Sequence, residues 1–221
     1  MADMELVIDY PSHIADRLLK DEIDMGLVPV AILPYMKDFY INTDYCIGSN
    51  GPVASVCLFS EVPIQQVETV LLDYQSRTSV QLARVLLKEY WKIRPRIVDA
   101  GKDFRDHIRG TTAGVVIGDR ALEQRKVSPM VYDLGDAWKN LTGLPFVFAA
   151  WISNKPLDPG FIQEFNSANR EGLEHIAEVV SENPYSVFDL TAYFTCYLDY
   201  RLDEPKRKGL DKFLEYLTVN V

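Results

Sequence analysis

The sequence is poor in the residue types that build metal centres and disulfides. Among 221 residues there are three cysteines and three histidines, spread far apart. Cys46, Cys57 and Cys196 stand in apolar or aromatic surroundings, and none has a second cysteine or a histidine at metal-ligand spacing. We therefore expect three buried structural thiols in a reducing, cytoplasmic compartment, with no metal site.

Positive charge is also scarce. The chain has 23 Lys and Arg residues against 32 Asp and Glu residues, which gives a net charge of −9. A nucleic-acid backbone would be repelled by this charge, and no segment is basic enough to offset it, so we expect no nucleic-acid partner. An anionic small molecule would have to be held by local donors, such as a helix N-terminus and a few arginines.

Long apolar runs and a signal peptide are absent as well. No apolar stretch reaches the roughly 20 residues that a membrane span needs, and we expect neither secretion nor a membrane partner. Hydrophobic residues make up 48% of the chain and charged residues 25%, which is typical of globular proteins. The length allows one large domain or two small lobes, and nothing in the sequence predicts an oligomeric state.

Apolar strand patterns and amphipathic helix patterns alternate along the first 150 residues. The chain opens with a predicted strand at residues 4–10, and a helix follows with Ser12 as its N-cap. From residue 159 onward the pattern predicts helices without intervening strands. The alternation indicates an α/β fold with layered helices and sheets.

The stretch 71–87 reads as a buried strand, a polar turn and an amphipathic helix in succession. The turn contains Ser76, Arg77, Thr78 and Ser79, which place three hydroxyls and a guanidinium at a helix N-terminus. Such a group suits a carboxylate or a phosphate, because orphan N–H groups and the helix dipole favour an anion. The alternative is ordinary helix capping, for which Ser and Thr are common. The pattern supports both readings about equally.

A second polar segment is the loop 46–52, which contains Ser49 and Gly51 and precedes a buried strand carrying Ser55. A tight turn explains the loop on sequence alone. In the functional alternative, Gly51 lets the backbone approach a ligand closely, and Ser49 or Ser55 donates a hydrogen bond to it.

A third polar turn follows the apolar strand at residues 113–117, where Gly118 and Asp119 precede a helix. Asp119 taken alone is most simply an N-cap. In an α/β sheet, however, ligands gather at the carboxyl ends of strands, so we expect this turn and the turn at residues 76–79 to open on the same crevice.

Two segments, near residues 55–60 and 146–153, are candidates for crossings between lobes. They divide the chain into one lobe made of residues 1–58 and 150–221 and a second lobe made of residues 59–149. A hinge of two strands would leave a cleft that can close on a small ligand.

Six blocks of the chain together resemble the chorismate dehydratases of the futalosine route to menaquinone. The likeness runs from about Leu6 to the last helices, and its longest block covers residues 132–151. The blocks are IDYPSHIADRL, IDMGLVPV, IGSNGPVASV, SRTSVQLARVLL, VVIGDRAL and YDLGDAWKNLTGLPFVFAAW.

The resemblance implies a two-lobed fold of the periplasmic-binding-protein type II class. It also implies a hydro-lyase without metal or organic cofactor, which removes water from chorismate to give 3-[(1-carboxyvinyl)oxy]benzoate. The substrate is a small dicarboxylate, and the turn at residues 76–79 offers donors for one carboxylate. Ser55 matches a substrate-contacting position of the family. The catalytic base is not assigned, and our hypothesis is that a carboxylate of the substrate itself acts as the base.

This sequence departs from the family at its start. Family members begin with an additional strand and a Ser-Tyr-Xaa-Asn motif whose Asn is implied in catalysis, and the present sequence starts after that point. Either the sequence is a shortened form of an active dehydratase or the protein has lost the strand. Two further alternatives share the fold: a non-catalytic binder of small carboxylates, and the sister 1,4-dihydroxy-6-naphthoate synthase, whose blocks fit less well.

Overall fold

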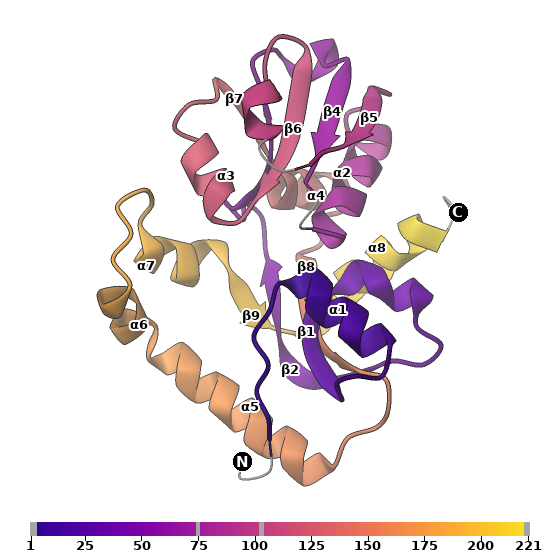
Figure 1. Ribbon diagram of the computed structural model, residues 1–221, viewed down its shortest axis with the longest axis vertical. Helices are drawn as coiled ribbons and strands as arrows, with labels where there is room; N and C mark the ends of the chain where they lie inside the picture. The colour runs from indigo at the N-terminus through magenta and orange to yellow at the C-terminus, as the bar shows by residue number, and fades with distance from the viewer. Residues whose placement is uncertain (1–3, 74–75, 102–103, 219–221) are drawn as a thin grey trace.

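Two β-sheets organise the molecule, one above the other in Figure 1. The computed structural model describes residues 4–73, 76–101 and 104–218. The lower sheet has the order β1-β8-β2-β9, with strands Met25–Pro29, Phe146–Ser153, Tyr40–Ser49 and Asp199–Arg201. The upper sheet has the order β5-β4-β6-β3-β7, with strands Arg96–Asp99, Thr69–Leu72, Thr112–Ile117, Val56–Ser60 and Met130–Asp133.

The register of the upper sheet decides where its polar turns lie. Strands β4 and β6 are parallel neighbours, with Leu71 opposite Gly114, while β3 is antiparallel to both β6 and β7. The carboxyl ends of β4 and β6 therefore meet at the same edge, which is where open α/β sheets place ligands.

The chain passes between the sheets twice. It leaves β2 for β3 through residues 50–55, and it returns from β7 to β8 through helix α4 (Leu134–Thr142). The two-lobed α/β arrangement with two connections agrees with the prediction. The predicted crossing segments, residues 55–60 and 146–153, were misplaced, because β3 and β8 each lie within a single sheet. The lobe boundaries, placed at residues 58 and 150 from the sequence, fall inside β3 and β8 and stay a prediction.

Alternate residues of each strand face different helices, as the pleat requires. In the upper sheet, Leu58 and Leu72 face helices α2 (Thr78–Glu89) and α4, whereas Phe59 and Leu71 face α3 (Asp119–Gln124) and the short 3-10 helix η3 (Phe104–His107). In the lower sheet, one face carries α1 (Pro11–Leu19), η1 (Val30–Tyr35) and α8 (Glu204–Thr218), and the other carries α5 (Pro159–Glu174).

The two sheets share one continuous core beneath α2, α4 and α8. Trp138 of α4 is fully buried at its centre, with its ring 5.2 Å from Phe146 and 6.1 Å from Phe213 between ring centroids. Its indole N–H donates to the Pro145 carbonyl over 3.2 Å. Burial of such large rings is the main stabilising term, and here it joins the upper and lower parts.

The predicted strand at residues 4–10 is not a strand in the structure. The segment pairs with no other strand among the described residues, and Leu6 and Ile8 are 70% and 87% exposed. Apolar alternation describes a strand only when a neighbouring edge supplies ladder hydrogen bonds. The helix that follows begins at Pro11 with Tyr10 as its N-cap, so the assignment of Ser12 as N-cap was wrong as well.

The C-terminal third contains more than the predicted helices. Strand β9 lies within it, so the prediction of helices alone was wrong. Helix α6 (Ile176–Glu182) is separate from α5, and α7 (Leu190–Ala192) leads into a π-helical turn, η4 (Tyr193–Tyr197). A remaining 3-10 turn, η2, covers Ile64–Gln66. In the described ranges, no helix has the length and apolar character to cross a membrane.

Candidate functional site

The start of helix α2 carries the first group of predicted site residues. Thr78 is 2% exposed, and its Oγ1 accepts a hydrogen bond from the Ala31 N–H of η1 at 3.2 Å. The Ser76 hydroxyl accepts from the Ser79 N–H at 3.1 Å, one residue before the N-cap Arg77, which makes no side-chain capping bond. Ser76 therefore satisfies a helix N–H, as ordinary capping would, while Thr78 contacts the lower part of the molecule.

Arg77 ties the same turn to helix α1. Its Nη2 lies 2.6 Å from Asp16 Oδ1, and the two side chains are 38% and 48% exposed. A pair exposed to this degree contributes little to stability. Its effect is to hold a guanidinium beside the N-terminus of α2, where positive charge already accumulates.

Ser55 and the turn after β6 form the second group. The Ser55 carbonyl accepts from the Gly118 N–H at 2.8 Å, and Ser55 Oγ lies 2.8 Å from the Tyr193 hydroxyl. Gly118 adopts φ +64° and ψ −149°, a conformation that is open to glycine alone. Gly118 is the N-cap of α3 and Asp119 is its first residue, so Asp119 is not the N-cap that its position suggested.

A buried carboxylate joins these two groups. Asp73 follows β4 directly, and its side chain is fully buried. It accepts from Arg120 Nη2 at 2.7 Å and from the Ile117 N–H at 3.3 Å. The turns after β4 and β6 are therefore bridged, as their shared edge allows. Asp73 was not among the residues predicted from the sequence, although an acidic residue directly after an apolar strand is a signal that could have singled it out.

Ser49 and Gly51 form a third group, in the loop between β2 and β3. The Ser49 hydroxyl donates to the Gly51 carbonyl at 3.0 Å, and both residues pack closely against Gly135 at the start of α4. The loop is thus a tight turn held against a helix. Both residues are engaged within the protein, and a ligand-binding role for them stays a prediction.

Asp133 positions the segment that carries Ser55. It is the N-cap of α4 and accepts from the Gly135 N–H, and it also accepts from the N–H groups of Val53 and Ala54 at 2.8–3.1 Å. Burial raises the pKa of its carboxyl, while the backbone N–H donors act in the opposite direction. Asp133, too, was not among the residues predicted from the sequence.

Hydrogen-bond donors and one positive charge lie at these polar turns, beside the Asp73 carboxylate; that they bind an anion stays a prediction. The hydroxyls of Ser55 and Thr78, the N-terminus of α2 and the guanidinium of Arg77 are all donors or positive groups. In the part of the chain that the structure describes, no group of three or more His, Cys, Asp or Glu residues could hold a metal ion.

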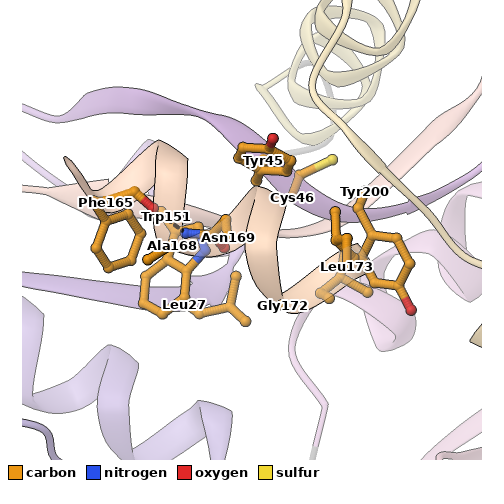
Figure 2. A pocket seen from close by; sticks show the side chains of 11 residues that line it. Leu27, Tyr45, Cys46, Trp151, Phe165, Ala168, Asn169, Gly172, Leu173 and Tyr200 are labelled. Carbon is orange, nitrogen blue, oxygen red and sulfur yellow. Dashed lines mark hydrogen bonds between the residues drawn. The ribbon is translucent and has the colours of Figure 1, made fainter. Parts of the chain in front are cut away.

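A separate hollow lies between helix α5 and the lower sheet (Figure 2). Its volume is about 430 Å³, and the rings of Trp151 and Phe165 in its wall have centroids 4.8 Å apart. A neighbouring hollow of about 410 Å³ shares Leu173 and Tyr200 with it. None of the nine predicted site residues lines either hollow.

The cysteines depart in part from the sequence expectation. Cys46 and Cys57 are buried, but Cys196 is exposed on the π-helical turn. The prediction of three buried thiols was therefore wrong for Cys196, because its aromatic sequence neighbours do not cover it. Burial raises the pKa of the Cys46 thiol to about 12.

A family model described as menaquinone biosynthesis matches residues 1–218. Among curated proteins, the chorismate dehydratase of Thermus thermophilus is 29% identical over 232 residues, covering 94% of this chain and 84% of that protein. The chorismate dehydratase of Campylobacter jejuni is 24% identical over 218 residues, covering 97% of this chain and 84% of that protein.

Solved structures share the fold at low sequence identity. A protein from Archaeoglobus fulgidus superposes with a TM-score of 0.68 at 14% identity, covering 97% of this chain and 85% of its own. An ABC transporter protein from Parabacteroides distasonis gives 0.62 at 15% identity, with coverages of 96% and 80%. The periplasmic aliphatic sulphonate-binding protein SsuA from Escherichia coli gives 0.50 at 15% identity, with coverages of 96% and 76%. The predicted two-lobed, binding-protein-like fold is confirmed.

Proposed function

The chain belongs to the menaquinone biosynthesis family, and from that premise we propose that it is a chorismate dehydratase. The observation that carries the proposal is likeness along the whole chain, since two proteins named chorismate dehydratase each align with more than nine-tenths of it. The enzyme would be a hydro-lyase of the futalosine route, acting in the cytoplasm on a small dicarboxylate and without a cofactor.

Chorismate, the proposed substrate, carries two carboxylates. The donors at the bridged turns suit one of them, because Ser55, Thr78 and the N-terminus of α2 offer hydrogen bonds and Arg77 adds positive charge. Ser76 and Ser79 help by fixing the first turn of α2. Gly118 and Asp119 lie at the same edge of the sheet, because the Ile117 N–H directly before them donates to Asp73.

The dehydration of chorismate requires little acid–base catalysis from the protein. The C–H bond at the ring carbon bearing the ether breaks, and its electron pair forms a ring double bond while the neighbouring C–O bond breaks. The departing hydroxyl combines with the proton as water, and the ring becomes aromatic. Aromatisation drives this step, so positioning of the substrate supplies most of what the protein must add. We propose that a carboxylate of the substrate takes the proton.

A second candidate function is binding without turnover. It is favoured by a fold shared with a sulphonate-binding protein. Fold alone does not choose between a lyase and a binder.

The test is to incubate the protein with chorismate and follow the reaction by mass spectrometry and ultraviolet absorbance. We expect a product lighter than chorismate by one water, with an aromatic chromophore. Ser55→Ala should lower kcat/KM about tenfold or more, because a hydrogen bond to a charged group is worth about 1.5–3 kcal/mol. Ser167→Ala, on the exposed side of α5, is the matched control and should leave the rate unchanged.

Calorimetry on the same samples separates the alternatives. Tight binding of chorismate without product would favour the binder. Absence of both binding and product would contradict both candidate functions.

A further inference from the structure

The segment after helix α6 reaches from the lower sheet to the polar turns of the upper one. We call residues 183–198 the C-terminal arm; it contains α7 and the π-helical turn, and it ends where β9 pairs with β2 (Figure 1). Two tyrosines of the arm contact the candidate site. The Tyr185 hydroxyl donates to the Asp119 carbonyl at 3.4 Å, and the Tyr193 hydroxyl lies 2.8 Å from Ser55 Oγ.

The π-helical turn starts at Tyr193. Its wide turn is closed by the Leu198 N–H, which donates to the Tyr193 carbonyl at 3.1 Å. Such turns are uncommon and are often found at functional sites, because the extra residue redirects a side chain. The ring of Tyr193 is held by Phe188 and Phe194, with centroids 6.3 Å and 5.2 Å away. The phenol is therefore fixed in direction by packing.

The partner of this phenol is the Ser55 hydroxyl, which the proposed function uses as a donor to the substrate. Ser55 is 4% exposed and has a single O–H donor. If Ser55 donates to Tyr193, no proton remains for a ligand. If Tyr193 donates, the Ser55 proton is free, and the incoming hydrogen bond makes it a stronger donor. Burial raises the pKa of the Tyr193 phenol, so the phenol keeps its proton at neutral pH.

We propose that Tyr193 is a positioning residue of the enzyme: its hydroxyl donates to Ser55 Oγ and thereby turns the Ser55 proton toward a carboxylate of the substrate. This inference rests on the proposed function. It adds a residue from the far end of the chain, which neither the polar turns nor their spacing in the sequence could indicate. It also gives the C-terminal arm a role, since the arm carries this phenol across from the lower sheet.

The experiment compares Tyr193→Phe with the wild type in chorismate dehydration and in calorimetric binding of chorismate. Phenylalanine keeps the ring packing and removes only the hydroxyl. We expect KM and the dissociation constant to rise about tenfold, with kcat changed less than about twofold, because the lost interaction orients the bound substrate in ground state and transition state alike. Tyr197→Phe, on the same π-helical turn with its ring against Phe188, is the matched control and should leave both constants unchanged.

A double-mutant cycle distinguishes positioning from a general loss of structure. In a Ser55→Ala background, Tyr193→Phe should have no further effect on KM, because it acts through the Ser55 hydroxyl. Thermal unfolding of each variant checks that the fold is kept.

Three outcomes decide the matter. A rise in KM that vanishes in the Ser55→Ala background supports the inference. Wild-type turnover with an unchanged KM in Tyr193→Phe, or with the same rise in both backgrounds, overturns the inference and leaves the proposed function standing. A wild type that neither binds nor converts chorismate overturns the proposed function and this inference with it.

Discussion

One largely buried carboxylate, that of Asp133 with a side chain 13% exposed, holds two segments near the candidate site together. Its oxygens accept from N–H groups on both sides, in the loop before β3 and in the first turn of α4. Asp133→Asn would turn an amide NH₂ toward some of these donors. We expect it to lower the free energy of unfolding by about 1–3 kcal/mol at neutral pH. Asp136→Asn, exposed in the same turn of α4, is the control and should cost less than about 1 kcal/mol.

The pH dependence of this difference has a defined sign. Burial raises the pKa of Asp133 above its ordinary value of 3.8, so in the folded state the carboxyl holds its proton more tightly than in the unfolded chain. This group therefore makes the folded state less stable as pH rises from about 4 through the folded pKa. The difference in the free energy of unfolding between wild type and Asp133→Asn, measured by urea titration, should therefore shrink over that pH range. A difference that grows with pH would show that the backbone N–H donors outweigh burial in setting the pKa of Asp133.

Thiol reactivity provides a second prediction at the scale of the residue. Cys196 is exposed, whereas burial raises the pKa of Cys46 to about 12 and also raises that of Cys57. Only the thiolate is nucleophilic, so brief alkylation at neutral pH should modify Cys196 alone. Mass spectrometry of peptides measures this directly. Rapid modification of Cys46 in the folded protein would mean that the wall under α5 opens to solvent.

At the scale of the residue, the sequence singles out individual polar side chains but does not indicate their partners, and their role as a site stays a prediction. Hydroxyls could be seen in the sequence where they flank apolar runs, as at Ser55 directly before β3 and Thr78 at the start of α2. Their partners come from segments distant along the chain, such as Ala31 and Tyr193, and no spacing rule links these positions. Asp73 and Asp133 were missed because a single acidic residue after a strand resembles an ordinary cap.

At the scale of the element, two glycines in helices make a matched pair. A Cβ on Gly209 of α8 would clash with the Pro145 carbonyl, a backbone atom that cannot move cheaply, whereas a Cβ on Gly172 of α5 would meet nothing within 4 Å. Gly209→Ala should destabilise the protein by about 1–3 kcal/mol. Gly172→Ala should stabilise it by about 0.5–1 kcal/mol, because alanine loses less backbone entropy in a helix. Thermal denaturation of both variants checks the signs, and equal shifts would contradict the close approach of α8.

Element prediction failed where pairing decides the outcome. Residues 4–10 show strand alternation yet pair with nothing in the described chain, while the three-residue strand β9 forms because β2 offers it an edge. Helices with a strong apolar stripe, such as α2 and α8, were predictable because their pattern is local. The π-helical turn at residues 193–197 has no local signature in the sequence.

At the scale of the whole molecule, the alternation of elements and the block resemblance predicted a two-lobed fold, and the structural relatives confirm it. What the sequence could not indicate is that the two sheets share one core beneath α2, α4 and α8. That core depends on long-range packing, such as Trp138 on Phe146 and Phe213. Thr78 and Ser55, 2% and 4% exposed, lie inside the molecule and contact the lower part through η1 and the C-terminal arm.

The most direct measurement is a crystal structure of the protein with the product, 3-[(1-carboxyvinyl)oxy]benzoate. We expect a carboxylate of the ligand within hydrogen-bonding distance of Ser55 Oγ or of the first turn of α2, with Tyr193 still bonded to Ser55. A ligand seated instead in the hollow under α5, against Trp151 and Phe165, would contradict it.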